Sequence, residues 1–318
     1  MEIMKKGGGI YQTAKMVKEA SPEELFSLGY SRLNEFLLQG VTTIEAKSGY
    51  GLDWETEKKQ LETVRRLNED HCIDIVSTFM GAHAIPEHYK QIPDLYVDLI
   101  INEMIPIVSK EKLAEFNDVF CEKGVFTPEQ AQRILTAGKK WGLSAKIHAD
   151  EIESCQGAEL AAEVGAISAD HLLKASEEGM KRMAEAGVVA VLLPDTAYFL
   201  KKDFANARKM LYLGVPVALA TDFNPGSSPT VSLSFIMNLA CMKMNMTAME
   251  ASAAATINAA HAINRGKEIG SIEKGKKADL VIHRVDRLIK LHYYYGMNHT
   301  GTVIKEGKIV VDEGKVIH

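Results

Sequence analysis

The sequence predicts an α/β fold, a TIM-like (β/α) barrel, and three observations support this prediction. Short apolar runs alternate with helix-like segments along most of the 318 residues. The runs are typical of strands buried on both faces, and such strands separated by helices form a parallel sheet with right-handed crossovers. The repeat of strand and helix is regular, which favours a closed barrel over an open doubly wound sheet.

Seven apolar runs are predicted to be strands, one fewer than a closed barrel of this type needs. Either one strand escapes the pattern or the chain begins too late. The seven runs are VTTIEAK (41–47), IDIVSTFMGAH (73–83), NDVFCE (117–122), LSAKIHAD (143–150), AISADHL (166–172), VVAVLLPD (188–195) and PVALATD (216–222).

The segments between the runs carry the start and stop signals of helices. Several open with Ser, Thr or Pro followed by acidic residues, and they close on Gly. Examples are TEKKQLETVRRLNED, TPEQAQRILTAGKKWG and SEEGMKRMAEAG. The strands are therefore expected to be joined by covering helices.

The pattern changes after residue 267, where short strands are joined by turns that contain glycine. GSIEKGKKADLVIHR and TGTVIKEGKIVVDEGKVI have this hairpin pattern. We expect a barrel domain at 1–267, incomplete at its N-terminus, and the C-terminal part of a small β-sandwich domain at 268–318. This tail is expected to be too small to form a sheet of its own.

The composition is that of a globular enzyme, and it argues against some partners. Hydrophobic residues make up 46% and charged residues 25%, and the net charge is −5. This mild acidity argues against nucleic acid and anionic membranes as partners, and HYYYG (292–296) is predicted to be a packed strand. The apolar runs are too short to cross a bilayer. The scattered cysteines and the lack of a leader-like N-terminus predict reduced thiols and a cytoplasmic location; the cysteines are Cys72, Cys121, Cys155 and Cys241.

Polar side chains recur at the carboxyl ends of the predicted strands, the edge where barrels of this type have their active sites. Each one alone has a structural explanation. A single histidine at a strand end more often makes a structural hydrogen bond, and Asp222 with its polar neighbours fits turn chemistry. Packing does not explain their recurrence at one edge. The residues are Tyr50, His83, His148, Glu151, His171 and Asp222.

Eight stretches of the chain resemble the imidazolonepropionases, which are members of the amidohydrolase superfamily. The resemblance runs from about residue 7 to the end of the chain. KSGYGLD together with GAHAIP and TDFNPGS points to this family rather than to the superfamily at large. The stretches are GGGI, EAKSGYGLD, TFMGAHAIPEHY, KIHADE, SADHL, LLPDTAYFL, ATDFNPGSSPT and IEKGKKADLVI.

The resemblance implies hydrolysis of the cyclic amide 4-imidazolone-5-propanoate to N-formimidoyl-L-glutamate in histidine degradation, with one divalent metal ion, zinc or iron. The family holds this ion with an HxH pair on the first barrel strand, a histidine on the fifth and an aspartate on the eighth. His148 matches the fifth-strand ligand and Asp222 the eighth-strand ligand. The chain contains no HxH, and the family places that pair upstream of GGGI. The chain is thus expected to be an N-terminally truncated member that binds metal weakly and hydrolyses little.

The other site roles are also implied by the resemblance. Glu151 and His171 lie beside the metal-bound water, where a base must take its proton. Asp222 passes a proton to the leaving nitrogen. The family is homodimeric and acts on a small molecule, which would be contacted by Tyr50, His83, Glu151, Asn224, Gly226 and Ser227.

Two other functions stay open. One is another cyclic-amide hydrolase or aminohydrolase of the same superfamily, such as a guanine or cytosine deaminase, against which Tyr50 and GAHAIP argue. The other is a non-catalytic fragment or a metal-free binding module. That function predicts decay of the site residues, yet five of them remain, namely His83, His148, Glu151, His171 and Asp222.

Overall fold

The computed structural model describes residues 9–317. The first two glycines of GGGI, the residues before them and His318 lie outside the described residues. The chain divides into two compact units. Among the described residues, the first consists of residues 9–29, 45–70 and 75–188, and the second of residues 30–44, 71–74 and 189–317. The domain boundary expected at residue 267 stays a prediction.

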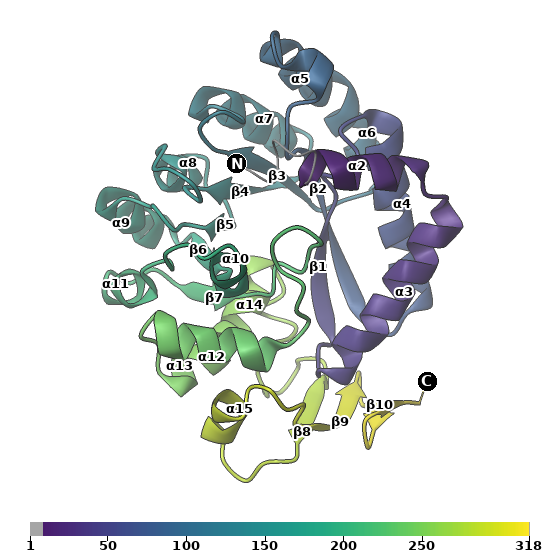
Figure 1. Cartoon of the computed structure of the whole chain (residues 1–318), viewed down its shortest axis with the longest axis vertical. Coiled ribbons are helices and arrows are strands. Elements are labelled where there is room, and N and C mark those ends of the chain that lie inside the picture. The colour runs from purple at the N-terminus through teal and green to yellow at the C-terminus, as the bar shows by residue number, and fades with distance from the viewer. Residues whose placement is uncertain (1–8, 318) are drawn as a thin grey trace. The chain divides into compact units, whose positions relative to one another are not determined.

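Seven strands follow one another in chain order in one sheet (Figure 1). This order confirms the seven strands predicted from the apolar runs. Neighbouring strands pair in parallel, as between the third, fourth and fifth strands. The strands are β1 (Thr43–Lys47), β2 (Asp74–Ala82), β3 (Phe116–Cys121), β4 (Ser144–Ala149), β5 (Ser168–His171), β6 (Val189–Leu192) and β7 (Val217–Leu219).

The central strands of the first unit have one apolar face and one charged face. Val119, Ile147 and Ala169 are paired across β3, β4 and β5 and are fully buried. Helices α7 (Pro128–Lys140) and α8 (Gly157–Glu163) pack on these strands. Because successive side chains of a strand point to opposite faces, the residues between the apolar ones share the other face. That face carries the charged side chains described below.

Two helices of the first unit begin at the capping residues that the sequence predicts. Thr127 and Gln130 form a capping box at the start of α7, and Ser176 caps α9 (Glu177–Ala186). Gly187 ends α9 with φ 72°, a conformation that favours glycine. The remaining elements are α2 (Ile10–Glu19), α4 (Trp54–Asp70), a 3-10 turn η1 (Glu87–Tyr89), α5 (Pro93–Leu99), a π-helical turn η2 (Ile100–Met104), α6 (Ile105–Lys110), and α3 (Pro22–Leu38), which runs into the second unit.

The second unit pairs β6 with β7 in parallel around an apolar cluster. Val189 and Val191 of β6 pack with Ala218 of β7 and with Ala262. Most of the chain around them is helical. These helices are α10 (Pro194–Phe199), α11 (Ala207–Tyr212), α12 (Leu233–Lys243), α13 (Ala248–Ala254), α14 (Ile257–Ala262) and α15 (Ile289–Tyr293).

The helices described between residues 9 and 317 include none with the length and apolar character needed to span a lipid bilayer.

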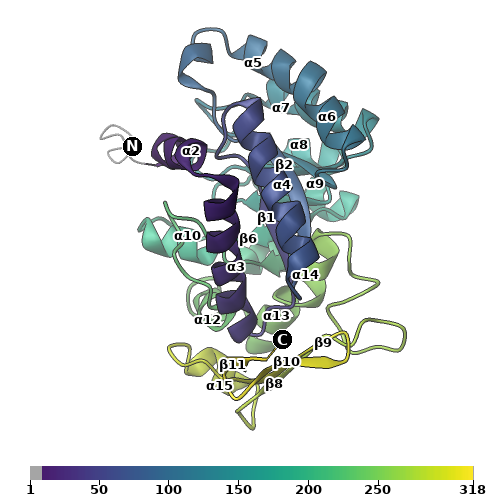
Figure 2. The same ribbon diagram turned by 90° about the vertical axis from the view of Figure 1, so that its right-hand side faces the viewer.

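The C-terminal tail forms an antiparallel sheet of four strands (Figure 2). The hairpin pattern predicted these strands, but the expectation that the tail is too small for a sheet of its own was wrong. The turn at Glu306 and Gly307, both with positive φ, joins two strands in the manner of a tight hairpin. The strands are β8 (Leu280–His283), β9 (Thr300–Lys305), β10 (Lys308–Asp312) and β11 (Lys315–Val316).

The aromatic run at 292–296 is not the strand that the sequence predicts, because its first residues close helix α15. His292 is buried, and its ring lies 3.1 Å from the Ser252 hydroxyl. Its backbone carbonyl accepts a hydrogen bond of 2.9 Å from the Asn238 side chain. These contacts with α12 and α13 outweigh the strand preference of tyrosine.

Candidate active site

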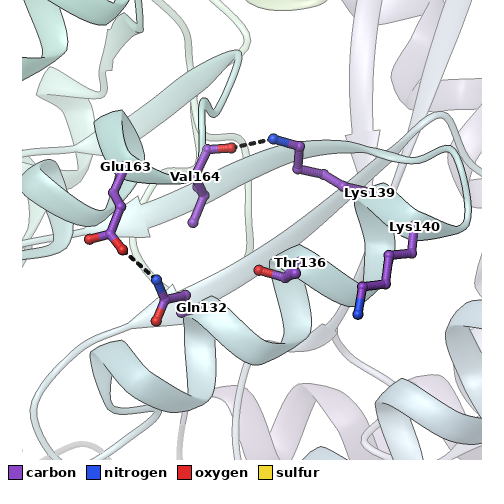
Figure 3. Close-up of a pocket in the computed structure, with 6 residues that line it drawn as sticks. All are labelled: Gln132, Thr136, Lys139, Lys140, Glu163 and Val164. Atoms are coloured by element: carbon purple, nitrogen blue, oxygen red, sulfur yellow. Dashed lines mark hydrogen bonds between the residues drawn. The ribbon is translucent and has the colours of Figure 1, made fainter.

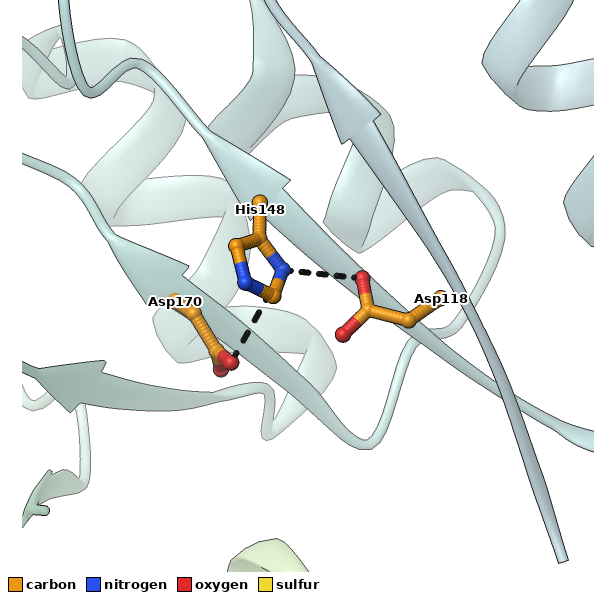
Figure 4. Close-up of side chains that lie close together, drawn as sticks. All are labelled: Asp118, His148 and Asp170. Atoms are coloured by element: carbon orange, nitrogen blue, oxygen red, sulfur yellow. Dashed lines mark hydrogen bonds and ion pairs between the residues drawn. The ribbon is translucent and has the colours of Figure 1, made fainter. Parts of the chain in front are cut away.

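His148 lies near the end of β4 on the charged face of the first unit, where it is buried. Its Nδ1 lies 3.1 Å from a carboxylate oxygen of Asp118 on β3 and 3.9 Å from one of Asp170 on β5 (Figure 4). With its proton on Nδ1, the ring keeps a lone pair on Nε2. Carboxylates hold metal-binding histidines in this orientation. Burial disfavours the imidazolium, but Asp118 outweighs burial and raises the pKa of His148.

Asp118, His148 and Asp170 lie close enough together to suggest a cation site, since one ligand atom of each lies within 4.8 Å of the others. The Lys47 ammonium forms ion pairs with both of these carboxylates. Its nitrogen lies 2.6 Å from Asp118 and 2.9 Å from Asp170. We infer that the two aspartates support His148 and that Lys47 neutralises them.

A second lysine completes the buried charge network. Lys146 is fully buried, and its ammonium lies 2.7 Å from Glu45. Glu45 also contacts Lys47 at 3.2 Å and accepts a hydrogen bond from Thr78. Burial acts to raise the pKa of Glu45. The two ammonium groups and the Thr78 hydroxyl outweigh burial and lower this pKa to about 2.

The low pKa of Glu45 predicts a loss of stability in acid. Its folded-state pKa lies below the ordinary 4.5, so its stabilisation is present above pH 4.5 and is lost as the pH falls toward about 2. The shift corresponds to about 3 kcal/mol. We expect urea unfolding to show a smaller loss over this range in Glu45→Gln than in the unsubstituted chain. Equal losses in the two chains would contradict the assignment.

His171 and Glu151 lie next to His148 at the same strand ends. The ring centroids of His148 and His171 are 5.1 Å apart, and Nε2 of His171 lies 3.8 Å from the Glu151 carboxylate. Nδ1 of His171 is buried without a hydrogen-bond partner among the described residues. His171 and Asp150 have positive φ, at 72° and 50°. Such backbone strain is concentrated at functional sites.

Tyr50 and His83 form the other side of this cluster. Their ring centroids are 5.1 Å apart, and the ring centroid of His83 lies 6.3 Å from that of His148. Nδ1 of His83 lies 2.9 Å from the carbonyl oxygen of Gly49. Burial, and after it the charge of His148, lowers the pKa of His83 to about 4. His83 is therefore neutral at pH 7 and can both donate and accept hydrogen bonds.

A buried carboxylate shapes the loop that carries Tyr50. Glu57 accepts backbone hydrogen bonds from Gly49 at 3.0 Å and from Gly51 at 2.6 Å. Gly49 has φ 114°, and a Cβ there would lie 3.0 Å from Cβ of His83. The glycine is thus required by its conformation and by the close approach of the histidine.

A second buried carboxylate, that of Glu122, shapes the loop that carries Glu151. This buried carboxylate accepts the backbone amides of Glu151, Ile152 and Glu153 at 3.0, 2.8 and 3.2 Å. Three amides directed at one carboxylate fix the course of the loop.

We expect Glu122→Gln to loosen this loop selectively. A hydrogen bond to a charged group contributes about 1.5–3 kcal/mol, so losing one speeds local amide exchange about tenfold or more. Hydrogen exchange with mass spectrometry should show this at 151–153 and leave 49–52 unchanged. Glu57→Gln is the matched control, with the opposite pattern. Unchanged exchange at 151–153 would show that Glu122 does not hold the loop.

The other predicted site residues lie together in the second unit, in the loop after β7. Asp222 has φ 52° and accepts a 2.6 Å hydrogen bond from the Thr196 hydroxyl. The Asn224 side-chain oxygen accepts the amides of Gly226 and Ser227 at 2.8 and 2.9 Å. The two bonds to Asn224 are turn chemistry, one of the two explanations given for this segment. Joint binding of an ion by Asp222 and His148 stays a prediction, because the two residues belong to different units.

A surface hollow of the first unit contains none of the predicted site residues. The Lys139 ammonium donates a 2.6 Å hydrogen bond to the backbone carbonyl of Val164, and the Gln132 side chain donates one of 2.5 Å to the Glu163 carboxylate. The hollow lies between α7 and the end of α8, and it is lined by Gln132, Thr136, Lys139, Lys140, Glu163 and Val164 (Figure 3).

The residues that support the site were not predicted from the sequence. Lys47, Asp118, Lys146 and Asp170 all lie within runs that were predicted to be buried strands. Charged residues are almost never fully buried unless they are paired. Four charges inside buried strands were therefore the available signal for a polar network on one face of the sheet.

Comparison with known proteins identifies the family. Residues 121–310 match the Amidohydrolase family. The imidazolonepropionase of Geobacillus kaustophilus (strain HTA426) is 64% identical over 316 residues, which cover 99% of this chain and 74% of the relative. The chain belongs to the imidazolonepropionases. The imidazolonepropionase of Streptococcus gordonii is 50% identical over 318 residues, covering all of this chain and 76% of the relative.

Solved structures share the fold of this imidazolonepropionase family member. An adenosine deaminase from Xanthomonas campestris with bound zinc has a TM-score of 0.72 at 19% identity, covering 95% of this chain and 73% of that protein. Guanine deaminase of E. coli has a TM-score of 0.73 at 15% identity, covering 95% and 78%. At these identities the likeness shows the TIM-like amidohydrolase fold alone.

Proposed function

We propose that the chain hydrolyses 4-imidazolone-5-propanoate to N-formimidoyl-L-glutamate, the reaction implied by its family. The observation that carries this proposal is 64% identity to an imidazolonepropionase over nearly the whole chain. The proposal is supported by the cluster of three histidines and a glutamate at the strand ends of the first unit.

The residues of the first unit fit a divalent metal ion. His148 has one ring nitrogen hydrogen-bonded to Asp118, which leaves the other for a metal. The His171 Nδ1, buried without a partner among residues 9–317, marks a second polar atom available to a ligand. We propose that His148 and Asp222 hold one ion, zinc or iron. Such an ion acidifies a bound water and polarises a carbonyl group.

Glu151 and His171 handle protons in this proposal. Glu151 accepts a proton from the attacking water, and its 3.8 Å separation from Nε2 of His171 suits a pair that shares this task. Asp222 delivers a proton to the ring nitrogen that leaves. The Thr196 hydroxyl holds one oxygen of Asp222 and so orients its carboxylate.

Substrate recognition is assigned to polar side chains of the first unit and to a loop of the second unit. The neutral ring of His83 and the Tyr50 hydroxyl suit an uncharged imidazolone ring. Asn224, Gly226 and Ser227 provide a loop for the propanoate tail. Because unpaired buried polar groups are costly, such contacts discriminate against molecules that lack matching atoms.

Weak metal binding is part of the proposal. The sequence contains no HxH, and His148 and Asp222 alone are fewer than the three protein ligands of a typical catalytic zinc site. We propose that the chain by itself turns over substrate slowly and that it forms a homodimer. Light scattering after size-exclusion chromatography tests the dimer.

The reaction is tested with a panel of substrates. The chain, supplied with Zn²⁺ or Fe²⁺, is incubated with 4-imidazolone-5-propanoate, guanine, cytosine and adenosine. The same panel is run with an extended version, in which the chain is joined to the part of the Geobacillus relative that the match does not cover. We expect imidazolone propanoate to be the only substrate of the panel that is turned over, and its turnover to be faster in the extended version than in the chain by itself. Turnover of a nucleobase or adenosine instead would favour an aminohydrolase, and no turnover in either version would favour a non-catalytic function.

A further inference from the structure

Two of the four cysteines lie side by side in the first unit. Cys121 is the last residue of β3 and is fully buried. Cys155 is half-buried in the loop between β4 and α8. The Cys155 sulfur lies 3.3 Å from the backbone carbonyl oxygen of Cys121. The sequence separates these residues by 34 positions, so only the fold brings them together.

The backbone around Cys155 is held in place. Its amide donates a 2.8 Å hydrogen bond to the Asp150 carboxylate, which also accepts the amides of Gly157 and Ala158 at 3.2 and 2.9 Å. The cysteine thus faces β3 from an ordered turn.

The two thiols differ in acidity. The neighbouring Cys121 side chain lowers the pKa of Cys155, although burial opposes this shift. The Cys155 side chain, followed by burial, raises the pKa of Cys121. Cys155 is half-buried whereas Cys121 is fully buried, so a dissolved electrophile reaches Cys155 first. The thiolate is the reactive form of a cysteine, and the lower pKa of Cys155 favours the same order. The buried Cys121 is then its neighbouring thiol.

We propose that Cys121 and Cys155 are an oxidation site at which a peroxide forms a reversible disulfide. The Cys155 thiolate attacks one peroxide oxygen, the O–O bond breaks, and hydroxide leaves to give a sulfenic acid. The Cys121 thiol then attacks that sulfur, the S–O bond breaks, and water leaves with the thiol proton. Two thiols are oxidised and one hydrogen peroxide is reduced to two waters.

The disulfide would fasten the loop that carries Glu151. Glu122, the residue after Cys121, already accepts the amides of residues 151–153. A disulfide between Cys121 and Cys155 covalently links the end of β3 to the loop just after residues 151–153. The inference is independent of the proposed reaction, because it rests on the thiols and not on substrate or metal.

The test maps the oxidised cysteines in the purified full chain. The chain is treated with hydrogen peroxide, free thiols are alkylated, and peptides are identified by mass spectrometry. We expect Cys121 and Cys155 to lose alkylation together, to appear in one cross-linked peptide and to recover with dithiothreitol. Cys72 and Cys241, which lie in the second unit, should stay alkylated.

Two variants and a control sharpen the result. Cys155→Ser should abolish the cross-link, and Cys241→Ser should leave it unchanged. Cys121→Ala should leave a sulfenic acid on Cys155 that dimedone traps. The proposal is overturned if Cys155 becomes a sulfinic acid while Cys121 remains alkylatable, if the cross-link involves Cys72 or Cys241, or if neither thiol is oxidised.

Discussion

Replacing Lys47 with methionine is expected to lower the free energy of unfolding by about 3–5 kcal/mol or to prevent folding. The Lys47 ammonium lies within 3.2 Å of three carboxylates, those of Glu45, Asp118 and Asp170. The two aspartate side chains are 0% and 4% exposed, so water cannot replace the lost cation. Urea unfolding followed by circular dichroism measures the effect.

Lys123→Met is the matched control for Lys47→Met. Lys123 also pairs with a carboxylate, that of Glu153 at 2.7 Å, but its side chain is 70% exposed. Exposed pairs add little to stability, so this variant should unfold like the unsubstituted chain. If both variants unfold alike, the buried network does not depend on Lys47 and the support assigned to His148 loses its basis.

Replacing Glu151 with glutamine is expected to lower turnover by about 10²–10⁴-fold, the usual contribution of a general base. Glutamine keeps the shape of the side chain and cannot accept the proton. The measurement uses the extended version, in which turnover is expected to be fast. Metal content should not change, because Glu151 is not a proposed ligand.

Glu153→Gln is the control for Glu151→Gln. It lies in the same loop, and Glu122 also accepts its amide, but its side chain bonds Lys123 at the surface. Full activity in this variant, together with the loss in Glu151→Gln, assigns the effect to the Glu151 carboxylate. A Glu151→Gln variant with undiminished turnover would remove Glu151 from the mechanism.

The strands and the strand-end residues were predictable because they depend on local patterns. LSAKIHAD is an apolar run that ends in polar residues, and the structure has strand β4 there with His148 near its end. Likewise, helix α7 begins at the Thr127 capping box, a signal that spans four residues. Such short-range information is present in any single sequence.

The supporting network was not predictable in the same way, because its partners meet only after folding. Lys47 and Asp118 are 71 positions apart, and Lys146 and Glu45 are 101 apart. The interior charges signalled that partners must exist, but only the folded structure, which brings side chains of β1 to those of β3 and β4, shows which residues they are. Similarly, docking of His292 against Ser252 turned a predicted strand into part of a helix.

Metal content measured together with turnover tests the central claim most directly, namely that His148 binds the ion used in imidazolone propanoate hydrolysis. Zinc per chain and kcat/KM are determined for the chain, for its extended version, and for the extended version with His148→Ala. We predict weak zinc binding and slow turnover in the chain, and one zinc and fast turnover in the extended version. His148→Ala should lose both, with kcat/KM falling at least about 100-fold, since even outer partners of metal ligands contribute about 10–100-fold. One tightly held zinc in the unextended chain, or zinc and turnover that survive His148→Ala, would contradict this account.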